Sequence, residues 1–132
     1  MKSLRFFLFL TTLLSIHAVY AQKPATLTVS YEFSNIVEGY DHNTYCEVWI
    51  DGVKAGESSR GLESKPNSFT IQTTRGIHNV EIKNFAEYQG TWEEHLVANE
   101  YSIDCYYSQS MNLKKKNKLK LLFDIDKGTI VK

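Results

Sequence analysis

Apolar and polar residues alternate with a period of two along most of this chain, which is the pattern of half-buried β-strands. Residues 26–33 show it most clearly, because every second position is apolar: Leu27, Val29, Tyr31 and Phe33. Beyond residue 21, apolar residues do not recur at helical spacing over a convincing length. The pattern therefore predicts an all-β fold.

Further short strands are expected wherever alternation or a short apolar run is bounded by turn residues. They cover residues 45–50, 53–56, 69–74, 77–85, 91–97, 100–107 and 118–125, and residues 128–131 are a candidate for one more after a turn. Residues 56–68 are polar and contain two glycines and a proline, so we expect a loop there. Seven or eight strands in one small domain predict an antiparallel β-sandwich, either immunoglobulin-like or prealbumin-like.

A tight hairpin is expected at Asp51-Gly52. This dipeptide suits the two positive-φ positions of a type I′ turn, which joins antiparallel strands through two residues. With a loop of that length, Val48 should face Ala55 across the hairpin.

The first residues have the features of a secretory signal peptide. Lys2 and Arg5 precede an apolar stretch, residues 6–16, and Ala21 is a small residue suited to cleavage. The stretch has 11 residues, whereas a membrane-spanning helix needs about 20, so no transmembrane segment is expected. Removal of residues 1–21 leaves one domain, residues 22–132. Its first residue is Gln22 and not a lipid-anchor cysteine, which predicts a secreted or periplasmic protein.

The two cysteines, Cys46 and Cys105, are expected to form a disulfide. An oxidising compartment favours the bond, and both residues occupy the inward parity of their expected strands. Closing a loop of about 59 residues would stabilise the fold by about 4 kcal/mol on the chain-entropy model. The alternative is a pair of buried free thiols.

Charge gives no indication of nucleic-acid binding. Without Lys2 and Arg5 the 15 basic residues become 13, against 15 acidic ones, so the net charge of residues 22–132 is slightly negative.

Four aromatic residues are candidate ligand contacts: Trp49, Trp92, Tyr106 and Tyr107. Trp49 has the outward parity and should pair across the hairpin with Lys54, so an exposed indole could stack on a sugar ring. Alternatively, the stem of Lys54 and a neighbouring strand cover the ring through a cation–π contact. Core packing explains most of the other aromatics equally well.

A lysine cluster follows these aromatics, and its members are Lys114, Lys115, Lys116, Lys118 and Lys120. It could contact an anionic lipid, lipopolysaccharide or an acidic glycan. The alternative is that the lysines solubilise a turn and protect the edge of the following strand from aggregation. Only alternate lysines would share a face of a strand.

Asp124 and Asp126 resemble the start of a calcium-binding loop, but Gly128 occupies the third acidic position and the closing glutamate is absent. This excludes an EF-hand and leaves only a weak calcium site shared with other loops as an alternative. We expect no metal site and no cofactor.

Catalytic motifs are missing from the sequence. Glu93 and Glu94 are adjacent in an expected strand and point to opposite faces, so they cannot act as a glycosidase pair. The three histidines after residue 21, His42, His78 and His95, lie far apart in sequence without metal-ligand spacing. We therefore expect a protein that is not an enzyme.

This chain resembles PEGA-type and carboxypeptidase-regulatory-like β-sandwich modules over residues 48–56 and 69–82, followed by Tyr88. Like those modules, it has a strand, an Ile-Asp-Gly turn, a short limb with glycine, and a later strand that starts from a Gly-x-His-x-Val turn. The signature tetrapeptide of the PEGA family is missing, and the excursion at residues 57–68 is longer than usual. The resemblance implies a non-catalytic envelope or extracellular module.

Together these features predict a secreted or periplasmic interaction module that binds another protein. The alternative is a small glycan-binding domain that uses Trp49 or Trp92 with nearby tyrosines.

Overall fold

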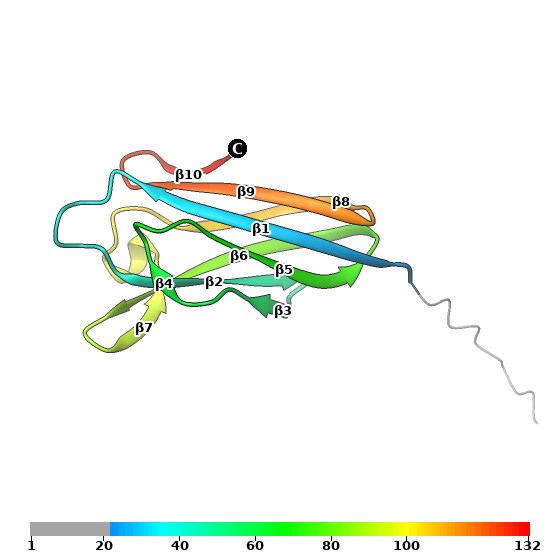
Figure 1. Ribbon diagram of the computed structural model, residues 1–132, viewed down its shortest axis with the longest axis horizontal. Coiled ribbons are helices and arrows are strands. Elements are labelled where there is room, and N and C mark those ends of the chain that lie inside the picture. Colours follow the sequence, from blue (N-terminus) through cyan, green and yellow to red (C-terminus); the bar gives the residue numbers. More distant parts are fainter. Residues whose placement is uncertain (1–21) are drawn as a thin grey trace, which may run out of the picture.

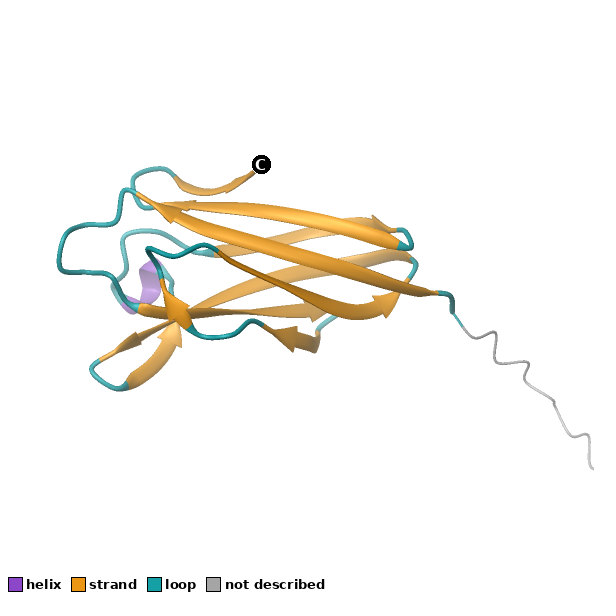
Figure 2. Ribbon diagram, in the orientation of Figure 1, coloured by secondary structure: helices purple, strands orange, loops and turns teal. Residues whose placement is uncertain are grey.

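The computed structural model describes residues 22–132, and in it two β-sheets pack face to face (Figures 1 and 2). The expected signal peptide, residues 1–21, lies outside the described residues. Ten strands and one short 3₁₀ helix follow in chain order: β1 (Pro24–Ser34), β2 (Asn43–Ile50), β3 (Val53–Glu57), β4 (Gly61–Leu62), β5 (Asn67–Thr74), β6 (Gly76–Tyr88), β7 (Thr91–Glu94), η1 (Val97–Asn99), β8 (Tyr106–Leu113), β9 (Lys116–Asp124) and β10 (Gly128–Val131).

The first sheet has the strand order β10-β9-β1-β5, and the second has β3-β2-β6-β7, with β4 paired to β2 and β8 to β6. Every pair is antiparallel except β1 with β9. The predicted all-β sandwich is confirmed. It has more strands than expected, partly because two-residue β4 lies in the segment predicted to be a loop. Among residues 22–132, no helix has the length and apolar character to span a membrane.

Inward-facing side chains from both sheets form a single apolar core, as the alternation predicted. Along β1, Leu27 and Val29 are fully buried and Phe33 packs against the cluster. The same cluster includes side chains from β2, β5, β6 and β9: Cys46, Val48, Ile71, Val80, Ile82, Leu119, Leu121 and Phe123. The sequence therefore predicted correctly which parity of β1 and of β2 faces inward.

The β2–β3 hairpin has the expected turn but not the expected register throughout. Asp51 and Gly52 have φ angles of 50° and 80°, as a type I′ turn requires. The strand register shifts between Trp49 and Val48, so that Gly56, and not Ala55, lies opposite Val48. A Cβ on residue 56 would lie 2.6 Å from Cγ2 of Ile71. The irregularity thus brings the residue without a side chain beside the core, and this corrects the predicted Val48–Ala55 pairing.

The strand expected at residues 100–107 is wrong, because β8 begins only at Tyr106. The backbone N–H of His95 donates to the carbonyl of Asn84 at 2.9 Å, and the N–H of Cys105 donates to the carbonyl of His95 at 2.9 Å. His95 and Cys105 therefore meet beside β6, and residues 96–104 leave the sheet as an excursion that contains η1. Sequence alternation alone could not reveal this detour.

A hydrogen-bonded cluster connects the β2–β3 turn to the β5–β6 turn. Asp51 Oδ2 lies 2.6 Å from His78 Nδ1, and Asp51 Oδ1 accepts the backbone N–H of Asn79 at 2.8 Å. His78 Nε2 lies 2.9 Å from the Thr74 carbonyl oxygen. The hydrogen bond from His78 and then that from Asn79 hold the pKa of Asp51 below its usual value.

We predict that Asp51→Asn destabilises the protein at about pH 6 but not in acid. Asparagine keeps the turn conformation, but the carboxylate is lost. Because the folded-state pKa of Asp51 is lowered, its contribution is present above the ordinary aspartate value of about 3.9 and disappears as pH falls through the folded-state pKa. Thermal unfolding across pH measures this. Asp126→Asn, at an exposed position, is the control. A stability difference between Asp51→Asn and wild type that did not change with pH would refute the lowered pKa of Asp51.

The predicted disulfide does not form, since Cys46 and Cys105 are both free and buried. Cys46 pairs with Asn84 on one side of β6, and the Asn84 N–H donates to the Cys105 carbonyl on the other side. Strands are about 4.8 Å apart, so the two Cα atoms are separated by roughly 10 Å, beyond the roughly 7 Å that a disulfide spans. Burial raises the pKa of the Cys46 thiol to about 12 and also raises that of Cys105.

Reducing agent should therefore leave the stability of the protein unchanged. A disulfide between these residues would contribute about 4 kcal/mol through its long loop, so its loss would be easy to detect. Urea unfolding with and without dithiothreitol, together with thiol counting in denaturant, measures this directly. Two reactive thiols per chain are expected, and a midpoint that fell with reductant would contradict the free-thiol assignment.

Candidate functional site

Three connecting segments meet at one end of the sandwich, on the left of Figure 1. They are residues 35–42 between β1 and β2, residues 58–66 around β4, and the 96–104 excursion. A cavity of about 360 Å³ lies among them, and we call it the end pocket. Its lining residues are Ile36, Val37, Tyr40, His42, Glu63, His95, Glu100, Tyr101, Ser102 and Ile125.

Glu63 is the most unusual residue of the end pocket, because its side chain is only 2% exposed. Its Oε1 lies 3.5 Å from Nδ1 of His42 and 3.4 Å from Nδ1 of His95. Among the described residues none of these three buried atoms has a hydrogen-bond partner. Buried polar atoms are nearly always hydrogen-bonded, so this cluster retains unused bonding capacity.

Backbone and loop contacts fix the position of this carboxylate. The N–H of Glu63 donates to the carbonyl of His42 at 2.9 Å. The next residue, Ser64, donates its N–H and its hydroxyl to the two carboxylate oxygens of Asp41, at 3.0 and 2.6 Å. Two of the pocket-forming loops are thereby held together. Because backbone hydrogen bonds anchor His95 to Asn84 of β6 and to Cys105, all three polar groups have fixed positions.

Aromatic rings surround the cluster. The ring centroids of Tyr101 and His95 are 4.2 Å apart, and Tyr101 also makes an edge contact with His42 at 5.8 Å. Tyr40 and Tyr88 each contact His42 edge-on at 6.3 Å, and both are more than half exposed. The pocket therefore has a buried polar floor and a tyrosine-lined mouth.

A smaller cavity of about 190 Å³ continues from this mouth. It shares Tyr40, His42, Glu100 and Tyr101 with the end pocket and adds Tyr88, Glu93 and Asn99. The hydroxyl of Tyr101 donates to Glu93 Oε1 at 3.0 Å. Burial, and then this hydrogen bond, raise the pKa of the Tyr101 hydroxyl.

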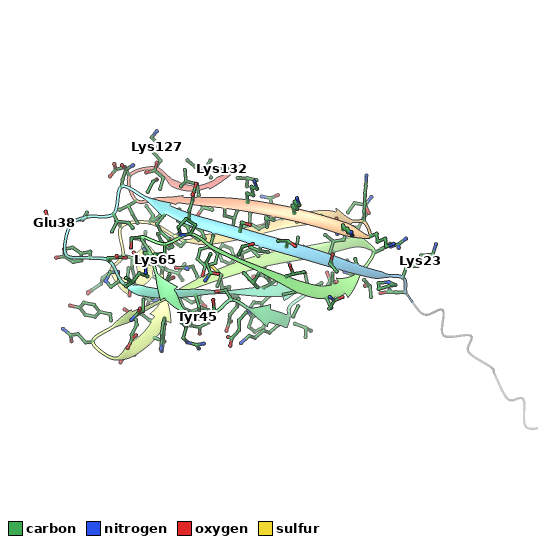
Figure 3. The ribbon with its side chains drawn as sticks, viewed as in Figure 1. Lys23, Glu38, Tyr45, Lys65, Lys127 and Lys132 are labelled. Carbon is green, nitrogen blue, oxygen red and sulfur yellow. The ribbon has the colours of Figure 1, made fainter. Side chains whose placement is uncertain are left out.

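The charge around both cavities is acidic. Glu63, Glu93 and Glu100 contribute to the walls, whereas no lysine or arginine of residues 22–132 lines either cavity. Figure 3 places another acidic residue, Glu38, at this end of the molecule and Lys23 at the opposite end. Carboxylates combined with aromatic faces attract cations, so the arrangement favours a positively charged group.

Within residues 22–132, no group of three or more His, Cys, Asp and Glu side chains could hold a metal ion. The carboxylate of Asp124, which the sequence offered as part of a weak calcium site, closes a turn. Its Oδ1 accepts hydrogen bonds from the side chain of Asn35 at 3.0 Å and from the backbone of Asp126 at 2.9 Å. The hydrogen bond from Asn35 lowers the pKa of Asp124.

The aromatic candidates predicted from sequence do not come together at the end pocket. Trp49 pairs with Lys54 as expected, but the cation over its ring is Lys83, with Nζ 4.1 Å from the centroid. Its indole N–H donates to Glu47 at 3.0 Å. This arrangement matches the covered-ring interpretation of Trp49, with a different lysine.

Trp92 is likewise partly covered. It makes an edge contact with Tyr45 at 5.1 Å, and Arg60 lies 5.3 Å from its ring. Tyr106 donates its hydroxyl to Glu81 at 2.5 Å, while Tyr107 packs against the core, where burial raises its pKa. The four aromatic residues therefore belong to different surroundings.

The lysine cluster lies away from the end pocket. Lys114 and Lys115 form the turn between β8 and β9, and Lys116, Lys118 and Lys120 alternate along β9 with less exposed residues. All five are exposed.

Sequence reasoning missed the residues that form the end pocket, above all His42, Glu63 and His95. They come from three separate loops, so no local spacing connects them. The one available signal was the group of bulky residues Ile36, Val37 and Tyr40 in an otherwise polar connection. Such residues in a loop are unusual unless they cover or line something.

No protein-family model matches this chain, and no curated protein matches it. Among solved structures, it is similar to a leucine-rich repeat protein from Bacteroides thetaiotaomicron, with a TM-score of 0.36 and 9% sequence identity. The match covers 76% of this chain but only 13% of that one. This chain thus spans a small part of that protein, and a likeness this low assigns neither a fold nor a function. The resemblance to PEGA-type and carboxypeptidase-regulatory-like modules stays a prediction.

Proposed function

We propose that this protein is a non-catalytic binding module whose end pocket receives a basic side chain from a protein partner. The carrying observation is the buried Glu63 carboxylate, whose Oε1 has no hydrogen-bond partner among the described residues and lies beneath a mouth of tyrosines. The ammonium group of a lysine or the guanidinium group of an arginine supplies the positive charge and the hydrogen-bond donors that such a site lacks.

The shape of the pocket suits a long basic side chain. Ile36, Val37 and Ile125 provide apolar walls for its methylene stem. The Tyr101 ring contacts both histidines of the floor and so lies beside the cationic head, whereas the Tyr40 ring lies at the mouth. The combination of mainly apolar walls and a few convergent polar groups is typical of ligand sites, and a volume of about 360 Å³ falls within their usual range.

The two buried thiols and the hydrogen-bonded His78 support a function without catalysis. Burial disfavours the thiolate form of Cys46 and Cys105, and a thiol is a weak nucleophile. His78 faces the Asp51 carboxylate and the Thr74 carbonyl oxygen, so it is poorly placed to accept a proton from a reacting group.

The proposed location is outside the cytoplasm, in a periplasm or in secreted form. This part of the proposal depends on the signal-peptide pattern of residues 1–21, and a protein partner in the cell envelope fits it.

A glycan is the second candidate ligand of the same pocket. Tyr40 and Tyr88 are 60% and 51% exposed, and exposed rings at a pocket mouth can stack on sugars. These tyrosines replace Trp49 and Trp92, which other side chains cover in part.

A calorimetric titration with a matched set of peptides tests the proposal. The peptides have the sequence Gly-Gly-X-Gly-Gly, where X is lysine, arginine, norleucine or glutamate, and a soluble neutral oligosaccharide is added to the set. We expect the lysine and arginine peptides to bind with a dissociation constant on the order of 1 mM, as suits a single side chain. Norleucine has a lysine-like stem without the ammonium, so its peptide should not bind.

Two tyrosine variants locate the site. Tyr40→Ala should weaken the binding of the lysine peptide, whereas Tyr106→Ala, which removes an exposed tyrosine from β8, should leave it unchanged. Equal binding of the norleucine and lysine peptides would overturn the proposal. Binding of the oligosaccharide alone, abolished by Tyr40→Ala, would establish the glycan candidate in its place.

A further inference from the structure

The outer face of the β10-β9-β1-β5 sheet has an ordered polar surface. Alternation along β9 directs Lys116, Lys118 and Lys120 to the same side as the outward residues of β1, and Lys118 pairs in register with Thr28 and Lys120 with Ser30. Alternate residues on a strand are roughly 6.7 Å apart. The three ammonium groups therefore extend from an evenly spaced row.

A row of hydroxyl groups runs beside these lysines. Thr28 and Thr70 join β1 to β5 through a side-chain hydrogen bond of 2.8 Å, and Ser30 and Ser68 do the same at 3.0 Å. Each hydroxyl can form further hydrogen bonds. The face thus offers cations and hydroxyl groups in parallel rows.

The charges of this row are not neutralised within the described chain. No ion pair joins Lys116, Lys118 or Lys120 to a carboxylate of residues 22–132, whereas Lys54 contacts both Glu47 and Glu57 at 3.0 Å. The nearby Glu32 is paired with Lys132. An external anion is the remaining source of opposite charge.

We propose that this face, which we call the lysine face, binds a linear acidic polysaccharide. Repeated carboxylate or sulfate groups match a row of cations, and the sugar hydroxyls match the threonine and serine rows. Aromatic side chains are absent from the outward positions of β1, β5, β9 and β10, although they are the usual stacking partners of nucleic-acid bases. Insertion into a membrane would require a broad apolar surface, and apart from Pro24, Leu122 and Ile130 the outward residues of these strands are polar or glycine.

Edge protection is the competing explanation of the same lysines. β10 pairs with residues 121–124 of β9 and the N–H of Lys132 donates to the carbonyl of Lys120, so within the described residues the part of β9 before Lys120 has a free edge, and lysines discourage edge-to-edge association. Under that explanation the lysines affect solubility and bind no specific polymer.

Affinity electrophoresis of the purified protein in gels containing polygalacturonate separates the two explanations. We expect retardation by polygalacturonate that weakens with added salt, and none by uncharged dextran. The double variant Lys118→Ser/Lys120→Ser should lose roughly fivefold or more in affinity. The control Lys65→Ser/Lys127→Ser removes the same charge from loop positions marked in Figure 3 and should bind like wild type.

Two further samples keep the result interpretable. Lys118→Arg/Lys120→Arg preserves the charge and should retain binding, which distinguishes a binding defect from misfolding. Tyr101→Ala, in the end pocket, should also retain it, so this test is independent of the proposed function. Equal loss in both serine variants, or binding to anionic vesicles but not to polygalacturonate, would overturn the proposal.

Discussion

Replacing Glu63 with glutamine is expected to raise the free energy of unfolding by about 1 to 3 kcal/mol and to weaken the binding of basic peptides about tenfold or more. The two effects have one cause. The carboxylate is 2% exposed, and its Oε1 lies 3.4 to 3.5 Å from two histidine nitrogens without a hydrogen-bond partner among the described residues, so in the free protein no hydrogen bond offsets the cost of burying this atom. Glutamine removes the charge and keeps the shape.

The expected gain in stability comes at a functional position, as is common where a site is not optimised for folding. Urea unfolding and calorimetric titration with the lysine peptide measure the two effects on the same samples. Glu38→Gln, an exposed carboxylate of the same end of the molecule (Figure 3), should change neither quantity. A loss of stability in Glu63→Gln would show that the carboxylate is a structural partner of His42 and His95, and would contradict its assignment to a ligand.

Phe123→Ala should destabilise the protein by about 3 to 5 kcal/mol. Phe123 is fully buried on β9, and its ring contacts Phe33 at 5.1 Å and Tyr31 at 6.1 Å between centroids. Because Phe123 pairs with Phe33 near the C-terminal ends of the parallel strands β9 and β1, the cavity would open beneath the two central strands of that sheet, close to these ends. Neighbouring side chains are held by both sheets and can fill the cavity only in part.

Leu122→Ala is the matched control, since it changes the adjacent residue of the same strand on the opposite face. Leu122 is half-buried, so a clearly smaller loss of unfolding free energy is expected. Equal losses in the two variants would mean that β9 does not face the core in the register described.

Period-two alternation predicted the faces of the strands well. Leu27 and Val29 are buried where the pattern placed them, and so is Cys46. The turn at Asp51-Gly52 also formed as expected, because positive φ angles at both positions strongly restrict which residues fit. These features depend on local sequence and on one hydrophobic face.

Strand order was beyond the reach of the same reasoning, and the cysteines illustrate why. Parity placed both Cys46 and Cys105 in the core correctly, but parity says nothing about which strands are neighbours. β6 lies between them, so two inward thiols do not meet. A similar limit applies to β8. Its consecutive polar residues Ser108, Gln109 and Ser110 interrupt the alternation of apolar and polar positions, so the pattern does not indicate this edge strand.

The end pocket depends entirely on tertiary structure. His42, Glu63 and His95 approach one another only because two loops and the excursion after β7 converge at one end of the sandwich. Their approach leaves the buried Oε1 of Glu63 without a hydrogen-bond partner in the described chain, and such local conflicts with good folding are expected at functional sites. Sequence spacing gave no reason to group them.

The most direct test of the central claim, that the end pocket takes a cation, is a pair of NMR titrations of the protein with n-butylammonium and with 1-butanol. The two probes share a butyl chain and differ chiefly in the charged head. Binding through apolar contact alone would therefore give similar responses to both. We predict saturable shifts of the backbone amide signals of Glu63, His95 and Tyr101 with butylammonium, and only weak changes with butanol. Equal responses to the two probes, or no response at these residues, would contradict the account.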